Sequence, residues 1–215
     1  MAKKTNKEIY LAAQVKWDKA RRPHQSEPDF KRRYEESRLE WLKLKYKDFE
    51  VTEAVRSDLR PFIRNFSFGT TNKVAISQTP SKFLYATKLT GDYTFECAGK
   101  QTVRTLAITP RQIDADIMLD PYNQPDDTEP VYIEENDGDG VYFKILSDSI
   151  PKNVVLRYIK APEIYDLQFS PNGFTEEDEM QQNEIIDLAV EKYLIAIGDF
   201  QTMQAQQVEI QQKGI

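Results

Sequence analysis

The sequence predicts an α+β protein in which N- and C-terminal helices pack as a helical bundle with an inserted antiparallel β-rich region. Three observations support this prediction. Helical spacing of apolar residues runs through residues 1–65, short alternating or β-branched runs dominate residues 66–169, and helical spacing returns in residues 170–215. We therefore expect an N-terminal helical segment, a β-rich insertion, and a C-terminal helix and tail that complete the bundle.

Three helices are expected in the N-terminal segment. Thr5 and Glu8 have the spacing of a capping box, in which each side chain accepts a hydrogen bond from a backbone N–H at the start of the helix. The stretch "RRPHQSEP" ends this helix, because proline lacks the backbone N–H. Pro28 suits the first turn of the second helix. The helices are expected over about residues 5–17, 28–46 and 51–63.

The central segment, residues 66–169, has the residue pattern of β-strands. Runs rich in Val, Ile, Thr and aromatic residues are separated by Gly, Pro, Asn and Asp, which is typical of strands joined by turns. The stretch "NDGDG" predicts a tight hairpin turn, because Asn and Gly tolerate positive φ. The expected strands are "KVAIS", "YATKLTGDYTFECA", "QTVRTLAIT", "PVYIEE", "GVYFKIL" and "NVVLRYIK".

The C-terminal helix has two halves of different character. Its first half carries an apolar stripe that should pack in the protein's own core: Ile185, Ile186, Ala189, Val190, Tyr193, Leu194 and Ile197. After Gly198, six glutamines surround four interface candidates: Phe200, Met203, Val208 and Ile210. A helix of that composition gains little from packing alone. We expect it either to dock on a neighbouring subunit or ring, or to be a frayed tail in solvent.

Composition and charge exclude several classes of protein. The chain has no apolar run long enough for a membrane span, and its N-terminus lacks the apolar core and cleavage site of a signal peptide. A single cysteine fits folding in a reducing cytoplasm. The net charge of −6 is uneven, because residues 1–48 carry 14 Lys/Arg against 8 Asp/Glu. That basic section suits nucleic acid, a neighbouring acidic copy of the same protein, or a solvated helix face.

Residues 126–139 form an acidic segment without Lys or Arg. Its members are Asp126, Asp127, Glu129, Glu134, Glu135, Asp137 and Asp139. The "DGDG" stretch has a partial likeness to a calcium loop but lacks the later ligands and the bidentate glutamate of an EF-hand. The alternative interpretations are a solvated loop and an acidic contact surface.

The search for catalytic, cofactor and metal sites finds no candidate residues. His24 is the only histidine, whereas a zinc site or a Ser-His-Asp arrangement needs a histidine among suitably spaced partners. The phosphate-binding motifs G-x-x-x-x-G-K-[ST] and G-x-G-x-x-G are absent. Cys97 lies in a strand-like run and is interpreted as a small buried residue. We expect a protein that is not an enzyme and needs no cofactor.

Four stretches occur in the same order as in a known family. They are "FEVTEAVRSDLRPFI", "DADIMLDPYNQPDDTEPVY", "VVLRYIKAPEIYDL" and "NEIIDLAVEKYLIAIGDF", which together span about residues 49–200. In these stretches the chain resembles the tail ring proteins of crAss-like bacteriophages. The first 30 residues and the segment 126–139 are not matched by this resemblance.

The resemblance implies a non-enzymatic, adaptor-like subunit of a dodecameric ring in the head-to-tail connector. Its partners would be further copies of itself, the portal protein and other tail ring proteins, with DNA only as the passing genome and no membrane. The protein would be made in the cytoplasm of the bacterial host and reside in the tail of the virion. In a ring, the acidic segment 126–139 is a candidate lumen or inter-ring surface. The alternatives are a DNA- or cargo-binding phage structural protein that uses the basic N-terminal helices, and a hydrolase with carboxylates hidden in the β-rich region.

Overall fold

The computed structural model describes residues 3–19, 25–49, 52–97, 99–111, 124–138 and 140–196 of the 215-residue chain. The chain divides into two compact units. The helical unit comprises Met1–Pro61 and Pro162–Ile215, and the β unit comprises Phe62–Ala161. The segment boundaries expected after residues 65 and 169 lie a few residues from the observed unit boundaries after Pro61 and Ala161.

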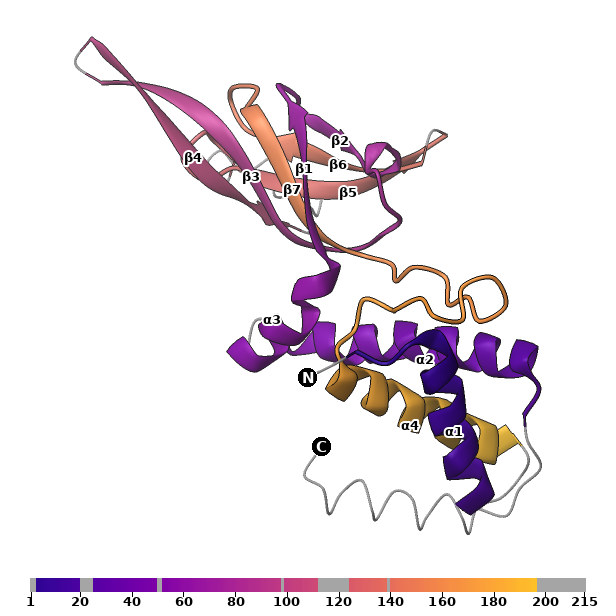
Figure 1. Cartoon of the computed structure of the whole chain (residues 1–215). Helices are drawn as coiled ribbons and strands as arrows, with labels where there is room; N and C mark the ends of the chain where they lie inside the picture. Colours follow the sequence, from indigo (N-terminus) through magenta and orange to yellow (C-terminus); the bar gives the residue numbers. More distant parts are fainter. Residues whose placement is uncertain are drawn as a thin grey trace. The chain divides into compact units, whose positions relative to one another are not determined.

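The helical unit contains four α-helices among its described residues (Figure 1). The N-terminal capping box is confirmed: the N–H of Thr5 donates to Glu8 Oε2 at 2.8 Å, and the N–H of Glu8 donates to Thr5 Oγ1 at 3.3 Å. Ser26 caps the second helix through the N–H of Asp29. The helices are α1 (Asn6–Lys19), α2 (Glu27–Lys47), α3 (Glu53–Leu59) and α4 (Glu179–Ala196), with a short 3-10 turn at Arg60–Phe62 after α3.

The core of the helical unit is rich in aromatic side chains. Trp17 from α1 lies 5.7 Å from the ring of Phe30 on α2 and 5.4 Å from the ring of Tyr193 on α4. The expected apolar stripe of α4 is confirmed where the structure describes it, because Ile185, Ile186, Ala189, Val190, Tyr193 and Leu194 are all buried. Ile197 lies outside the described residues.

The β unit is a seven-stranded sheet in the order β1-β7-β3-β4-β5-β6-β2. Its strands are β1 (Ile63–Gly69), β2 (Lys73–Ala75), β3 (Phe83–Cys97), β4 (Lys100–Pro110), β5 (Val131–Asp137), β6 (Gly140–Leu146) and β7 (Lys152–Lys160). The six strands expected from the sequence are confirmed, and β1 was not expected. The hairpin turn predicted at "NDGDG" is also confirmed by the pairing of Asp137 with Gly140.

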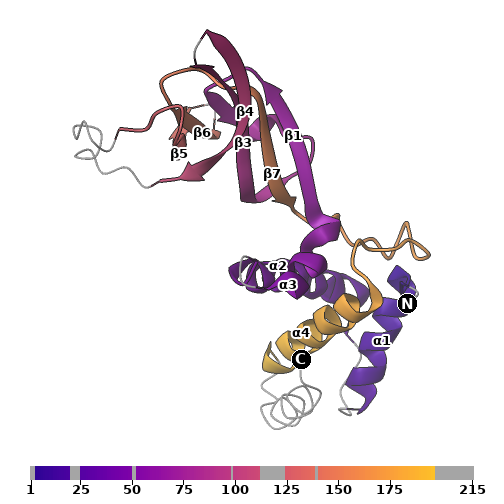
Figure 2. The same cartoon turned by 90° about the vertical axis from the view of Figure 1, so that its left-hand side faces the viewer.

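The sheet curls into a nearly closed barrel, as Figure 2 shows from the side. One side of the sheet encloses an apolar core to which most strands contribute. The buried members are Val74, Leu89, Ile108, Phe143, Ile145, Val154, Leu156 and Tyr158. Burial of this set is the main stabilising contribution to the β unit.

The predicted fold class is wrong. The protein is a mixed α/β protein dominated by the seven-stranded sheet, and not a helical bundle that carries an antiparallel insertion. The sheet is not wholly antiparallel either, because β4 and β5 pair in parallel at Thr109↔Val131 and Pro110↔Tyr132. Local periodicity identifies strands, but it does not encode the long-range pairing that places β7 between β1 and β3.

Candidate functional site

The connection from β7 to α4 turns large apolar side chains outward. In this segment, residues 162–178 of the helical unit, Ile164 is 76% exposed, Phe169 is 82% exposed and Phe174 is 63% exposed. Single exposed apolar residues are ordinary on protein surfaces. Three in one short loop are unusual and mark a candidate interaction surface. We call residues 162–178 the apolar loop.

The N-terminal end of the chain holds the apolar loop in place. The side-chain amide of Asn6 donates to the carbonyls of Asp166 and Ser170, each at 2.8 Å. The backbone N–H of Asn6 donates to the carbonyl of Gly173, and that of Lys7 to the carbonyl of Pro171, each at 2.9 Å. Four hydrogen bonds therefore fix the loop from one side.

Arg38 on α2 holds the two ends of the loop from within the helical unit. It is 1% exposed, and its guanidinium donates to Glu177 Oε1 and Glu176 Oε2, each at 2.6 Å, and to the carbonyl of Glu163. Burial opposes the charged form of Arg38, but the neighbouring Glu177 and Glu176 carboxylates outweigh it and raise its pKa. The guanidinium is therefore a permanently charged clamp that joins the start of the loop to its end.

Tyr165 is the inward-facing counterpart of the exposed residues. Its side chain is buried, its ring lies 4.9 Å from the ring of Tyr34, and its hydroxyl donates to the carbonyl of Asn6 at 2.6 Å. Burial raises the pKa of Tyr165 well above its ordinary value, so the hydroxyl remains a donor throughout the physiological range. The loop therefore has a buried aromatic anchor at Tyr165, whereas its apolar residues Ile164 and Phe169 are exposed.

A tight turn fixes the tip of the apolar loop. The N–H of Gly173 donates to the carbonyl of Ser170 at 3.0 Å across the sequence Ser-Pro-Asn-Gly, and proline favours the second position of such a turn. A Cβ atom at Gly173 would lie 2.4 Å from Ser170 Oγ and 3.1 Å from the carbonyl oxygen of Ser170, so a larger residue would require the Ser170 side chain to rotate away. Phe169 and Phe174 flank this turn. Their exposure therefore belongs to an ordered loop, and ordered apolar groups bind partners at a low entropic cost.

The acidic segment is only partly available for contacts. Asp126 accepts hydrogen bonds from the N–H groups of Thr128 and Glu129, and the Thr128 hydroxyl is the main cause that lowers its pKa. The remaining acids that bond within the chain are Asp127 with Ser149, Glu135 with Tyr142 and Lys144, and Asp137 with Lys73. Glu129 and Glu134 are exposed, and Asp139 lies outside the described residues. The lumen or inter-ring role of this segment stays a prediction.

Many of the basic residues in the first 48 positions are used inside the helical unit. Besides Arg38, Lys16 pairs with Asp187, and Lys45 pairs with Asp58 and Glu184. Lys3, Lys4 and Arg33 also donate to groups on the apolar loop or α4. These six basic side chains are therefore engaged within the helical unit, and binding of DNA by this part of the sequence stays a prediction.

The other sites considered from the sequence are placed as follows. The interface candidates Phe200, Met203, Val208 and Ile210 lie outside the described residues, as does His24. Within the described part of the chain, no group of three or more His, Cys, Asp or Glu side chains is arranged to hold a metal ion. In the same part of the chain, no helix has the length and apolar character needed to span a membrane.

Comparison with known proteins identifies no relative, so the evidence for function comes from the fold and its surfaces. No protein-family model matches the sequence, and no curated protein matches it.

The apolar loop was not predicted from the sequence. A signal was present, because Phe169 and Phe174 stand among Asp, Ser, Pro, Asn and Gly, outside any helical or alternating pattern that would bury them.

Proposed function

We propose that this protein is a structural subunit that acts by association, as one member of a ring in the tail connector of a bacteriophage. The observation that carries association is the anchored apolar loop with exposed Phe169 and Phe174. The ring and the phage rest on the resemblance of residues 49–200 to the tail ring proteins of crAss-like phages. In this role the subunit links the portal to the tail and surrounds the path of the ejected DNA, without making or breaking a bond.

The exposed aromatic residues supply a useful amount of binding free energy. Complete burial of a phenylalanine side chain stabilises by about 1.5–3 kcal/mol, so covering the exposed fractions of Phe169 and Phe174 contributes roughly 2–4 kcal/mol together. A contribution of that size changes a dissociation constant by roughly 30- to 1,000-fold. Repeated once per subunit around a ring, even a weak contact holds the assembly together.

The test is a double substitution, Phe169→Ser with Phe174→Ser. Because both side chains point away from the core, we expect unchanged stability of the isolated protein and a large loss of incorporation into phage particles. Val15→Ser on α1 is the matched control, since Val15 is an exposed apolar residue outside the loop. Incorporation is measured by quantitative mass spectrometry of particles purified from cells in which the variant replaces the wild-type protein.

Two results would contradict the proposal at different levels. Normal incorporation of the double variant would show that the apolar loop is not an assembly contact. Absence of the wild-type protein from purified particles would overturn the role as a tail subunit itself.

A further inference from the structure

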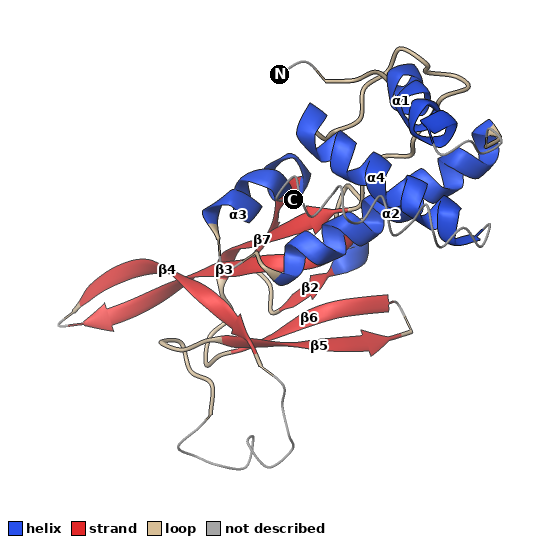
Figure 3. Ribbon diagram, turned by 90° about the horizontal axis from the view of Figure 1, so that it is seen from below, coloured by secondary structure: helices blue, strands red, loops and turns tan. Residues whose placement is uncertain are grey.

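Among the described residues, the short pairing between β4 and β5 leaves one edge of each strand without a strand partner. These strands pair only at Thr109↔Val131 and Pro110↔Tyr132, where β4 ends and β5 begins (Figure 3). Residues 101–107 of β4 therefore have a strand partner on the β3 side only, among the residues that the structure describes. Residues 133–136 of β5 likewise have a strand partner on the β6 side only in that part of the chain. Unpaired edges are templates for strands of another chain.

The backbone groups that face the open edge of β4 can be assigned from its hydrogen bonds. The N–H of Thr109 donates to the carbonyl of Pro130 at 3.1 Å, and the N–H of Arg111 donates to the carbonyl of Tyr132 at 3.0 Å. Odd-numbered residues of β4 therefore turn their N–H and C=O groups away from β3, because successive residues alternate. The pairing of Cys97 with Lys100 across a two-residue turn gives the same alternation. The open edge thus presents the backbone of residues 101, 103, 105 and 107.

The backbone groups at the open edge of β5 follow from its hydrogen bonds in the same way. The carbonyls of Pro130 and Tyr132 accept from β4, so even-numbered residues of this strand face away from β6. The turn that pairs Asp137 with Gly140 agrees, because it directs odd-numbered residues toward β6. Glu134 and Asn136 therefore present their backbone N–H and C=O groups at the edge.

The β3–β4 ribbon is poorly covered within its own chain. Pairing of β3 with β7 extends only to Asp92↔Lys152, so the ribbon beyond that point has two strands. Residues 101–105 of β4 are exposed on both faces, and Val103 is 61% exposed. A two-stranded ribbon gains little stability alone, and a third strand at its open edge would complete a sheet.

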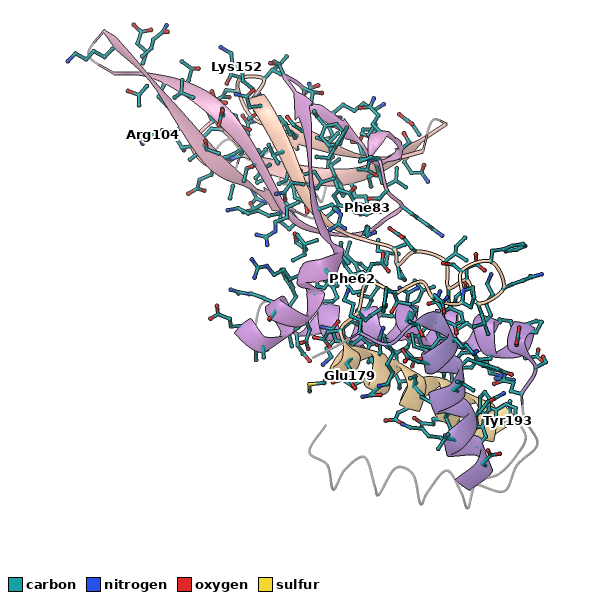
Figure 4. All side chains as sticks on the ribbon, viewed as in Figure 1. Phe62, Phe83, Arg104, Lys152, Glu179 and Tyr193 are labelled. Carbon is teal, nitrogen blue, oxygen red and sulfur yellow. The ribbon has the colours of Figure 1, made fainter. Side chains whose placement is uncertain are left out.

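The two open edges have complementary charge. Strand β4 carries Lys100 and Arg104 and no acid, whereas β5 carries three acids and no base. Of these acids, Glu135 pairs with Lys144 and Asp137 with Lys73, so Glu134 is the exposed acid that remains for the edge. Arg104 lies on the ribbon opposite Tyr93, just beyond the end of the β3–β7 pairing at Asp92 (Figure 4). Opposite charges on neighbouring strands stabilise their pairing, and like charges oppose it. A β4 edge is therefore better matched to a β5 edge than to another β4 edge.

We infer that the open edge of β4 in one copy of this protein pairs with the open edge of β5 in the next copy. This inference rests on the proposed ring function and supplies the contact between neighbouring subunits. Each copy has one edge of each kind, so the contact is head-to-tail and leaves both end copies able to extend. Head-to-tail contacts of this kind close into rings when the rotation per subunit allows it.

The test uses two variants that block one edge each. Val103→Pro removes an N–H that faces the open edge of β4, and Glu134→Pro removes one that faces the open edge of β5, so both leave the existing ladders in place. We expect each variant alone to self-associate at least about tenfold more weakly than wild type. Val103→Thr and Glu134→Thr are the controls that keep the N–H. Association is measured by sedimentation equilibrium up to the solubility limit, and circular dichroism checks the fold of each variant.

A mixture of the two variants separates this contact from its alternatives. The Glu134→Pro copy keeps an intact β4 edge and the Val103→Pro copy keeps an intact β5 edge, so their mixture should form a one-to-one dimer that grows no further. Self-association of Glu134→Pro at the wild-type level would mean that the open edge of β5 takes no part in the contact and would overturn the inference.

Hydrogen exchange of the wild-type protein provides the second measurement, which does not depend on the proline variants folding. Amides 101, 103, 105 and 107 should exchange more slowly as protein concentration rises. Exchange that is independent of concentration would mean that the edge is free or is covered within its own chain, and would also overturn the inference. Incorporation of the protein into particles is measured separately, so the edge contact can fail while the ring function stands.

Discussion

Removal of the Arg38 side-chain charge is the most informative perturbation of the helical unit. In Arg38→Met the side chain keeps an unbranched apolar stem, but Glu177, which is 0% exposed, loses the guanidinium that neutralises it. Breaking a buried ion pair by removing one partner costs about 3–5 kcal/mol, because the remaining charge stays buried without compensation. Domains of this kind are stable by about 5–15 kcal/mol in total, so the loss is a large fraction of stability.

A double-mutant cycle shows whether that cost comes from the stranded carboxylate. Glu177→Gln removes the acid charge and keeps the shape of the side chain. We expect the double variant, Arg38→Met with Glu177→Gln, to be more stable than the sum of the single effects implies, by about 1–3 kcal/mol. The excess reports the coupling between the two groups directly.

The assay is urea unfolding followed by tryptophan fluorescence. Both tryptophans of the chain, Trp17 and Trp41, are buried in the helical unit, so their emission reports that unit and not the β unit. With a urea dependence of about 1–3 kcal/mol per molar, a loss of 3 kcal/mol lowers the midpoint by about 1–3 M. Lys192→Met is the control, because its ion pair with Glu40 is partly exposed and contributes at most about 1 kcal/mol.

Two results would refute the reasoning about Arg38. An Arg38→Met midpoint close to that of Lys192→Met would mean that the buried network does not hold the apolar loop. Strict additivity in the cycle would mean that Arg38 acts through packing and not through its charge.

Three further predictions concern other parts of the chain. Deletion of residues 201–215 should leave a folded monomer that assembles poorly into particles, and normal rings from the truncated protein would contradict the docking of this tail. Gly91→Ala should destabilise the β unit by about 1–3 kcal/mol in thermal unfolding followed by circular dichroism, because the new Cβ would lie 2.8 Å from Pro151 Cβ. The pKa of Asp126 should lie below its ordinary value of 3.8 and rise toward it in Thr128→Ala, as measured by NMR titration. The stabilisation from Asp126 is therefore present above pH 3.8 and is lost as the pH falls through its lowered pKa.

The elements of this fold follow from the sequence because their signals are local. The capping box at Thr5 and Glu8, the turn before Gly140 and the buried stripe of α4 each depend on residues a few positions apart. Strand β1 was not expected because its alternation of covered and exposed positions is confined to the five residues from Asn65 to Gly69, and its first residue directly follows the 3-10 turn at Arg60–Phe62.

The sheet was not predictable in the same way, because strand order depends on contacts between residues far apart in the sequence. β7 pairs with β1 and β3, whose first residues lie roughly 70 to 90 positions before it, and nothing in its own sequence names those partners. The parallel pairing of β4 with β5 likewise cannot be predicted from the residues of either strand alone. The predicted helical bundle failed for this reason: the helices were identified, but the extent of the sheet was not.

The candidate site was predictable only in part. The sequence identifies the acids of residues 126–139, but their hydrogen bonds to Ser149, Tyr142 and Lys73 depend on how the strands pair. The exposure of Phe169 and Phe174 depends on Asn6 and Arg38, which lie more than a hundred positions earlier in the chain. An aromatic residue in a turn-rich segment indicates a surface only when the anchors of that segment are known.

Cryo-electron microscopy of intact phage particles tests the central claim most directly. We predict density for this fold repeated around the axis of the portal, with the apolar loop of each copy covered by a neighbouring chain. Particles that lack the fold, or that contain it without rotational repetition about that axis, would contradict the account.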